Sequence, residues 1–350
     1  MTEFNFGRSR ISDKGPCYII AEIGSNHQGN IEVAKQMIEI AADCCVDAIK
    51  FQKRNNKKLY TKKCYDKAYE NPDSWGATYG EHRERLEFGI NEFRKLKEHT
   101  ENNGLEFMAT PFDFESVDLL ENIGVTSYKM ASGDVTNTPL LEYIAKLGKP
   151  MFVSTGASTL DEIRLAYDTI LKHNKKLVLF HCVSSYPAEY DILNLRMIKT
   201  LKKEFPKAII GYSGHDNGIL APVIAYMLGA MVVEKHFTLN HAWKGRDHKF
   251  SLEPTGLRKQ VRDLRRVDLS LGDGKKTLHD YEMDSRKIMG KSLYARRNMS
   301  TKSIIRREDI SIKTPGGAIP PYRLQELVGK RLLADMNEED PFSGELVADE

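Results

Sequence analysis

Residues 19–30 read IIAEIGSNHQGN, an apolar run that leads into the polar side chains of Glu22, Asn26 and His27. The run predicts a buried β-strand whose carboxyl end carries a carboxylate, an amide and an imidazole. Such groups at the end of a strand are typical of the wall of a functional site. Whether they belong to a site depends on where the other strands of the chain end.

This strand, CYIIAEI (17–23), is the first of eight short runs rich in β-branched or aromatic residues. The other seven are DAIKFQ (47–52), LEFMATPF (105–112), TSYKMAS (126–132), PMFVST (150–155), LVLFHCVSS (177–185), AIIGYS (208–213) and MVVEKHF (231–237). Segments with helical periodicity separate and follow them, at 31–43, 84–103, 114–122, 138–147, 160–173, 192–204, 218–228 and 255–271.

Eight strand-then-helix units over about 270 residues predict an α/β fold of the (β/α)₈ TIM-barrel type, which usually takes ~250 residues. An open, doubly wound sheet is the competing architecture. It is less favoured because no GxGxxG turn follows the first strand.

The composition excludes several function classes. Lys and Arg number 52 against 49 Asp and Glu, a net charge of only +3, which provides no general attraction for nucleic acid or anionic membrane. No apolar run reaches the ~18 residues that span a bilayer, and the polar start MTEFNFGRSRISDKG does not resemble a secretory signal. The five cysteines lack metal-type spacing and are odd in number, which suits reduced thiols. We expect a cytoplasmic protein with no nucleic-acid or membrane partner.

The predicted strand ends are almost all polar, and in a TIM barrel the carboxyl ends of the strands form the active site. The residues there are Glu22, Asn26, His27, Lys50, Gln52, Thr110, Lys129, Ser132, Ser154, Thr155, Ser184, Ser185, Tyr186, Ser213, His215, Glu234 and His236. Any one of these residues could simply be a polar side chain that is hydrogen-bonded at the end of a strand. That interpretation accounts less readily for a polar residue at nearly every strand end.

Two histidines are candidate metal ligands. His215 and His236 end adjacent predicted strands, so both imidazoles can reach one ion, and two histidines with open positions suit Mn²⁺, Fe²⁺, Zn²⁺ or Co²⁺. Glu22 and Asp247 are candidates for the remaining positions or for orienting the ligands. The alternative is a pair of buried histidines hydrogen-bonded to the backbone.

A lysine and several serines predict an anion site. Lys129 supplies a point charge, and the hydroxyls on neighbouring strands donate hydrogen bonds to a phosphate. These are Ser132, Ser154, Ser184 and Ser213. Lys50, across the mouth of the barrel, would neutralise a second anionic group such as a carboxylate. A Schiff-base lysine, as in aldolases, is the alternative for Lys129.

The connection after the second strand, roughly 53–82, is too long and irregular for an idle turn. Its Trp75, Tyr79 and His82 would cover a sugar or similar polyol, unless the segment is a surface excursion packed by its own aromatic residues.

After about residue 280 the strand-then-helix rhythm stops. Short alternating strands with Gly and Pro turns follow a polar linker, GDGKKTLHDYEMDSRK (272–287). We therefore expect a catalytic barrel over 1–280 and a linker with a small β-rich domain over 281–350. About 60 residues make a marginal core, so docking or dimer contacts should stabilise this domain.

Many of these motifs, in order, resemble those of the sialic acid synthase family. They are IIAEIGSNHQGN, DAIKFQK, SWGATYGEH, ATPF, YKMASGD, VSTGAS, HCVSSYP, GYSGH, VVEKHFTL, DHKFSLEP and LVGKRLLADM. The resemblance runs over nearly the whole chain, and its last part is similar to the antifreeze-like SAF domain. SWGATYGEH resembles the animal 9-phosphate branch of the family, whereas FDFESVDLL is closer to bacterial legionaminate-type members.

The resemblance implies condensation of phosphoenolpyruvate with an N-acylated hexosamine, such as N-acetylmannosamine, to a nine-carbon 3-deoxy-2-keto sugar acid and phosphate. It implies Mn²⁺ or Mg²⁺ on His215 and His236, and proton transfer or water orientation by Glu22 and Glu234. Tyr186 and Asp247 match sugar-contact positions of the family and complete the predicted catalytic set. Phosphoenolpyruvate would be held by Lys50, Gln52, Thr110, Lys129, Ser132, Ser154, Ser184 and Ser213. We expect a homodimer in which the SAF domain of one subunit covers the barrel of the other.

The chain departs from the family pattern at two positions. Ser184 stands where some members have Asn, and Thr314 stands where bacterial members commonly have an arginine that reaches a neighbouring subunit's sugar. Lys313 and Arg323 are only guesses for its replacement. Lys244, Arg246 and Lys249 either meet a sugar 6-phosphate or form a surface basic cluster.

Several functions stay open. The same chemistry on a 6-phosphorylated sugar or on a diacetamido hexose is the main alternative. A Schiff-base aldolase and a non-catalytic sugar-binding barrel are the others.

Overall fold

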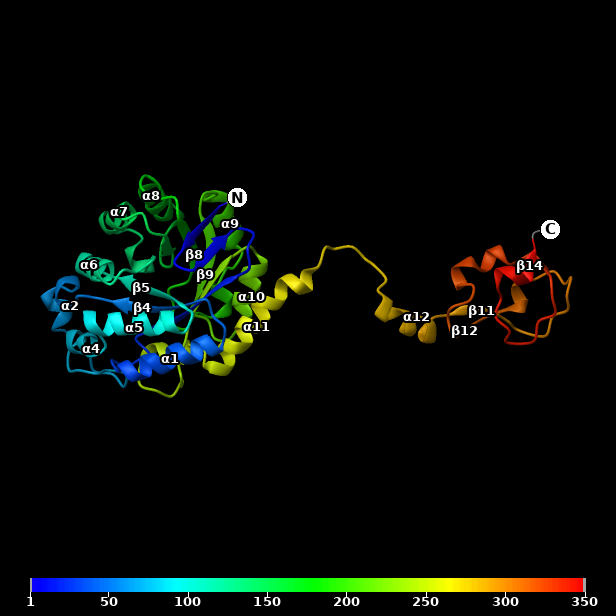
Figure 1. Cartoon of the computed structure of the whole chain (residues 1–350), viewed down its shortest axis with the longest axis horizontal. Helices are drawn as coiled ribbons and strands as arrows, with labels where there is room; N and C mark the ends of the chain where they lie inside the picture. The colour runs from blue at the N-terminus through cyan, green and yellow to red at the C-terminus, as the bar shows by residue number, and fades with distance from the viewer. Residues whose placement is uncertain (1, 349–350) are drawn as a thin grey trace. The chain divides into compact units, whose positions relative to one another are not determined.

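The structure is a computed structural model that describes residues 2–348. It divides into two compact units, Met1–Gly272 and Asp273–Glu350, which are taken separately below (Figure 1).

The first unit is built on eight parallel strands, and the eight predicted runs all contain one. They are β3 (Tyr18–Gly24), β4 (Ala48–Lys53), β5 (Glu106–Pro111), β6 (Tyr128–Met130), β7 (Met151–Ser154), β8 (Leu177–Cys182), β9 (Ile209–Gly214) and β10 (Val232–His236). Their hydrogen-bonded order is β5-β4-β3-β10-β9-β8-β7-β6, and β5 and β6, at its two ends, also lie side by side. The sheet is therefore a nearly closed barrel, as the (β/α)₈ prediction requires.

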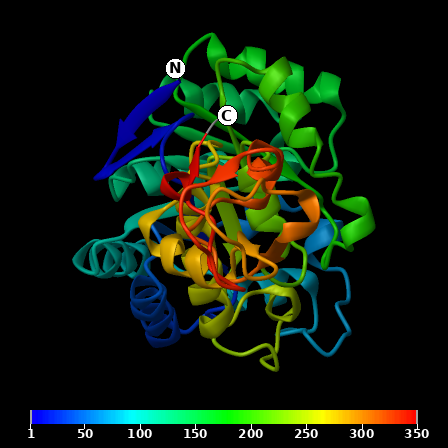
Figure 2. The same cartoon turned by 90° about the vertical axis from the view of Figure 1, so that its right-hand side faces the viewer.

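Helices surround this barrel (Figures 1 and 2). They are α1 (Ile31–Asp43), α5 (Ile90–Asn102), α6 (Phe114–Asn122), α7 (Thr138–Lys146), α8 (Leu160–Leu171), α9 (Met197–Glu204), α10 (Leu220–Met227) and α11 (Pro254–Leu271). Because helices cover the outer face, strands such as β3 and β8 are buried at every residue. Helix α1 begins where the Asn30 side chain accepts hydrogen bonds from the amides of Glu32 and Val33.

Two predicted helices begin later than their sequence pattern indicates. The pattern at 84–103 becomes α5 only from Ile90, because residues 79–85 belong to the separate helix α4 (Tyr79–Arg85). The pattern at 192–204 becomes α9 only from Met197, because Tyr190–Ile192 form a 3₁₀ turn.

The long connection after β4 is folded rather than irregular. It holds α2 (Asn56–Leu59), α3 (Lys62–Tyr65) and α4, and α4 begins with a capping box between Thr78 and Glu81. This connection leaves the carboxyl end of β4, so it lies on the face of the barrel where the predicted site residues are.

A hairpin not predicted from the sequence closes the opposite end of the barrel. It is formed by β1 (Glu3–Phe6) and β2 (Ser9–Ser12). Phe6 contacts Phe152 and Tyr18 with ring centroids 5.5 and 5.6 Å apart, near the starts of β7 and β3. The hairpin thereby covers the amino-terminal ends of these strands, on the side away from the predicted site residues.

The second unit contains α12 (Met283–Met289) and two small antiparallel sheets. One sheet pairs β11 (Ser292–Ala295) with β12 (Ile310–Lys313), and the other pairs β13 (Arg331–Leu332) with β14 (Val347–Ala348). Leu293, Ile305, Leu332 and Phe342 are fully buried in a core of their own. Across residues 2–348, no helix combines the length and the apolar character that crossing a bilayer requires.

Candidate active site

A cavity of about 610 Å³ opens at the carboxyl ends of the barrel strands. All fourteen residues predicted from the sequence to act in catalysis, substrate binding or metal binding line it. Trp75, Tyr79 and His82 of the long connection line it too, as do Lys244 and Arg246. Strands far apart in the sequence therefore converge on one space, as the predicted barrel implies.

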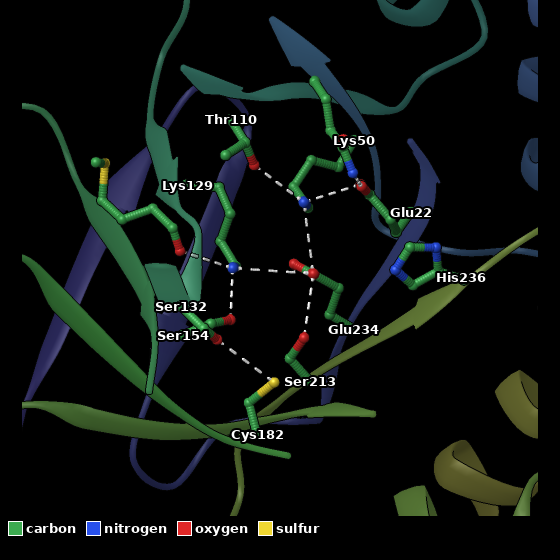
Figure 3. A network of polar contacts seen from close by, with 12 residues as sticks. Glu22, Lys50, Thr110, Lys129, Ser132, Ser154, Cys182, Ser213, Glu234 and His236 are labelled. Atoms are coloured by element: carbon green, nitrogen blue, oxygen red, sulfur yellow. Dashed lines mark hydrogen bonds and ion pairs between the residues drawn. The ribbon is translucent and has the colours of Figure 1, made fainter. Parts of the chain in front are cut away.

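Lys50 lies at the centre of the buried charges (Figure 3). Its Nζ is 2.9 Å from Glu22 Oε2 and 3.5 Å from Glu234 Oε1, and it donates a hydrogen bond of 3.1 Å to Thr110. Burial would lower the pKa of Lys50, but Glu22 and Glu234 outweigh burial and raise it, so its ammonium is charged. The neighbouring Glu22 accepts a 2.6 Å hydrogen bond from Gln52, and burial raises the pKa of Glu22.

Lys129 also lies near Glu234, the second glutamate contacted by Lys50. Its Nζ donates 2.6 Å to Ser154 Oγ and 3.0 Å to the carbonyl of Met130, and lies 3.9 Å from Glu234 Oε1 (Figure 3). Ser213 donates to the same Glu234 oxygen at 3.2 Å. Burial would raise the pKa of Glu234, but Lys129 and Lys50 lower it, and burial lowers the pKa of Lys129.

The serine side of the cavity is tightly fitted around a glycine. The amide of Gly156 donates 3.0 Å to Ser132 Oγ. A Cβ at this position would come within 2.3 Å of Ser184 Oγ and 2.9 Å of Ser132 Oγ, so only glycine leaves both hydroxyls in place. Cys182, whose Sγ is 3.7 Å from Ser132 Oγ, completes this wall.

The two candidate metal ligands face one another. The ring centroids of His215 and His236 are 5.4 Å apart, and Phe250 packs against both rings. Burial lowers the pKa of His215 to about 4 and that of His236 to about 3, so both imidazoles are neutral. Neutral imidazole is the form that binds a metal ion.

The chemistry of these donors fits a divalent metal. His215 Nδ1 is 2.8 Å from the carbonyl of Val183, which makes Nδ1 the donor and leaves Nε2 with its lone pair. His236 Nδ1 is buried without a hydrogen-bond partner, and Asp247 Oδ2 lies 3.9 Å away. Within residues 2–348, no three His, Cys, Asp or Glu side chains are close enough to form a complete metal cage. The two imidazoles thus offer two ligands, with open positions for Asp247, substrate or water.

A buried ion pair lies beside these histidines in the sequence but outside the cavity. Lys235 and Asp216 are fully buried, with 3.2 Å between Nζ and Oδ1, and Tyr212 donates 2.6 Å to the same oxygen. Lys235 also donates to the backbone carbonyl of Asp216. Because Lys235 precedes His236 and Asp216 follows His215, this pair links β10 to the segment that follows β9, next to both histidines in the sequence.

Several residues of the cavity were not predicted from the sequence. Arg54 follows β4, Arg83 lies on α4, and Cys182 and Phe112 end β8 and follow β5. The sequence did contain a signal for Arg54, because this basic residue comes only two positions after Gln52. Arg83 carried no signal, because its place depends on how α4 folds back over the barrel.

Other predicted residues have different surroundings. His27 stacks on Phe88 at 4.2 Å and accepts from the Gly29 amide at 3.0 Å; burial lowers its pKa to about 3. It is a buried packing residue and not part of the cavity lining. Lys249 pairs with Asp73 at 3.4 Å outside the lining. Lys313 and Arg323 lie in the second unit and pair with Glu339 and Glu326.

We predict that Lys235→Met destabilises the protein by about 3–5 kcal/mol, because the Asp216 carboxylate is left buried without its partner charge. The double variant Lys235→Met/Asp216→Leu should lose less than the sum of the single losses, since no charge is stranded. Urea unfolding measures both. Lys35→Met removes the half-buried partner of the exposed Glu32 and should cost less than ~1 kcal/mol. A Lys235→Met loss as small as that control would contradict the argument.

Comparisons with known proteins show which family the chain belongs to. A profile of the NeuB family matches residues 37–276. The chain is 40% identical to N-acetylneuraminate-9-phosphate synthase of Homo sapiens over 96% of this chain and 94% of that protein. It is 36% identical to N,N'-diacetyllegionaminic acid synthase of Legionella pneumophila over 92% of both chains.

A solved structure is similar as well. It is that of N-acetylneuraminic acid synthetase from Leptospira borgpetersenii in complex with citrate, at a TM-score of 0.70 and 36% identity. The match covers 81% of this chain and 95% of that one. From the profile, the relatives and the shared fold, we conclude that this chain belongs to the NeuB family.

Proposed function

We propose that this protein condenses phosphoenolpyruvate with the open-chain aldehyde of an N-acylated hexosamine, yielding a nine-carbon 3-deoxy-2-keto sugar acid and inorganic phosphate. The observation that carries this proposal is the approach of Lys50 and Lys129 to one Glu234 oxygen, in the cavity that also holds two neutral imidazoles. The relatives named as synthases of such sugar acids support it.

Phosphoenolpyruvate would use both lysines. Its phosphate would bind Lys129, because an ammonium with several serine hydroxyls provides the charge-assisted donors that a phosphate needs. Those hydroxyls belong to Ser132, Ser154, Ser184 and Ser213. Its carboxylate would bind Lys50 with Gln52 and Thr110. Lys50 already donates to Thr110, which holds the ammonium toward the cavity.

His215 and His236, with Asp247, would hold the divalent metal. Mn²⁺ suits two imidazole ligands better than Mg²⁺, which prefers oxygen ligands. When bound, the ion would polarise the aldehyde oxygen of the sugar as a Lewis acid.

The proposed reaction makes and breaks bonds at the aldehyde and at carbon 2 of phosphoenolpyruvate, and it moves protons that the two glutamates could transfer. Carbon 3 of phosphoenolpyruvate forms the new bond to the aldehyde carbon, and the aldehyde oxygen takes up a proton. Water adds to carbon 2 and loses one proton, which balances the proton taken up by the aldehyde oxygen. When the bond from carbon 2 to the phosphate oxygen breaks, the new hydroxyl on carbon 2 becomes the ketone, and its proton passes to the departing phosphate. Glu22 and Glu234 lie on either side of Lys50, where they would move these protons or orient the water, and Tyr186 would contact the sugar.

Residues 273–348 are proposed to be a SAF domain, by the resemblance of their sequence and their small antiparallel sheets. Its covering of a partner's barrel in a homodimer, and the cytoplasmic location, stay predictions from the sequence. Thr314 leaves open which residue reaches the N-acyl group.

The reaction is tested by incubating the purified protein with phosphoenolpyruvate, Mn²⁺ and one sugar at a time. The panel comprises N-acetylmannosamine, its 6-phosphate and the 2,4-diacetamido hexoses. We expect release of phosphate, together with a 2-keto sugar acid, for at least one sugar. No release with any of them would contradict the proposal. Borohydride trapping of pyruvate on Lys129 would support the Schiff-base alternative instead, which the lowered pKa of Lys129 keeps open.

His236→Ala should lower kcat/KM by ~10³-fold or more, because Lewis-acid polarisation contributes several kcal/mol. Binding of Mn²⁺, followed by electron paramagnetic resonance without substrates, should weaken in parallel. His173→Ala removes a histidine outside the cavity and should change neither measurement. Unaltered Mn²⁺ affinity in His236→Ala would refute the metal assignment.

Lys129→Met should raise the KM for phosphoenolpyruvate by ~10- to 100-fold, because a charge-assisted contact is lost. The KM for the sugar should stay close to its original value. Lys149→Met provides the control, since Lys149 pairs with Glu121 away from the cavity. An unchanged KM for phosphoenolpyruvate would argue against the phosphate role.

A further inference from the structure

The cavity has an excess of basic side chains, and part of this excess lies away from the two lysines proposed to hold phosphoenolpyruvate. Six basic and three acidic side chains line it. In the inner half, Lys50 and Lys129 are matched by Glu22 and Glu234. The excess lies in the outer half, where Asp247 is the single lining carboxylate beside four basic residues. These are Arg54, Arg83, Lys244 and Arg246.

Arg83 is one of these basic residues without a close carboxylate. It is half-buried on α4, and its Nε donates 3.1 Å to the Tyr79 hydroxyl. Within residues 2–348, no carboxylate oxygen lies within 4.0 Å of its guanidinium nitrogens. Asp247 acts on Arg83 from beyond that distance, so the guanidinium has no ion-pair partner in contact and keeps its other N–H groups available for an anion.

Arg54 is a buried neighbour of Arg83: burial, and then the nearby charge of Arg83, lower the pKa of Arg54. Its guanidinium lies 3.8 Å from the ring centroid of Phe112 and donates 2.6 Å to Gln52 Oε1. Its partner Glu87, at 3.6 Å, is also the ion-pair partner of Lys53 at 3.0 Å. One carboxylate therefore serves two cations, and the positive charges of Arg54 and Arg83 stay close together without full compensation.

Aromatic groups complete the outer wall. Lys244 lies 4.8 Å from the ring centroid of Trp75, and the Trp75 amide donates 3.2 Å to His82. Asp73, near Trp75 in the long connection, accepts from the Gly245 amide at 3.3 Å. The long connection and the loop after β10 thus meet at the cavity mouth and hold these basic groups in place.

We infer that Arg83, together with Arg54, forms a second anion subsite, which binds a phosphate monoester at the end of the sugar opposite its reacting aldehyde. This inference rests on the proposed function. A phosphate dianion offsets both guanidinium charges, and its oxygens match the fork of guanidinium donors. The sugar then spans the cavity, with its aldehyde toward His215 and His236 and its phosphate toward α4.

The test compares N-acetylmannosamine with its 6-phosphate, both as ligands and as substrates. Calorimetry without phosphoenolpyruvate should show at least ~10-fold tighter binding of the 6-phosphate to the native protein, the gain from a charge-assisted contact. Arg83→Met should lose ~10- to 100-fold in affinity and in kcat/KM for the 6-phosphate, and less than ~3-fold for the free sugar. Arg83→Lys should recover part of the loss, since it retains the charge without the fork.

Arg94→Met is the matched control. Arg94 lies on α5, is exposed, donates to Asn122 and does not line the cavity, so its loss removes the same charge without touching the subsite. Equal affinity of the native protein for the two sugars, an equal loss for both sugars in Arg83→Met, or the same losses in Arg94→Met would overturn the inference. Failure of the proposed function is distinct, because it abolishes turnover of every sugar and leaves the calorimetric comparison intact.

Discussion

The structure of the site depends on four charges that are buried together: the ammonium groups of Lys50 and Lys129 and the carboxylates of Glu22 and Glu234. Each side chain is at most 5% exposed. A single buried charge would cost several kcal/mol, so this group is stable only because each member has an opposite charge or a hydrogen-bond donor nearby. The separations from Glu234, 3.5 and 3.9 Å, are longer than the 2.9 Å between Lys50 and Glu22. Glu234 therefore holds the two lysines less closely than Glu22 holds Lys50, and both ammonium groups can still bind an incoming anion.

The register of the barrel strands brings these groups together. Glu22 on β3 pairs in register with Lys50 on β4, and Glu234 on β10 pairs with Ser213 on β9. Both pairs are in direct polar contact in the folded protein. His236 in turn pairs in register with Glu22. Because adjacent parallel strands end at the same level, a regular barrel aligns carboxylates, lysines, serines and imidazoles around one opening without help from long loops.

The two halves of the cavity have different physical characters. The inner half is built from strand ends and is balanced in charge, which suits chemistry shared by related synthases. The outer half is built from the connection after β4 and the loop after β10, and it is basic and aromatic. The relatives are named for different sugar acids, so the outer half is where we expect selection among sugars to arise.

The sequence alone was sufficient to predict the eight strands, the barrel and fourteen of the residues that line its cavity. Local patterns carry that information, since an apolar run marks a strand and a barrel places every strand end on one face. The N-terminal hairpin, the later starts of α5 and α9, and the roles of His27 and Lys249 needed the structure. So did Arg54 and Arg83. Their positions follow from how separate segments pack in space, and that packing has no periodic signal along the chain.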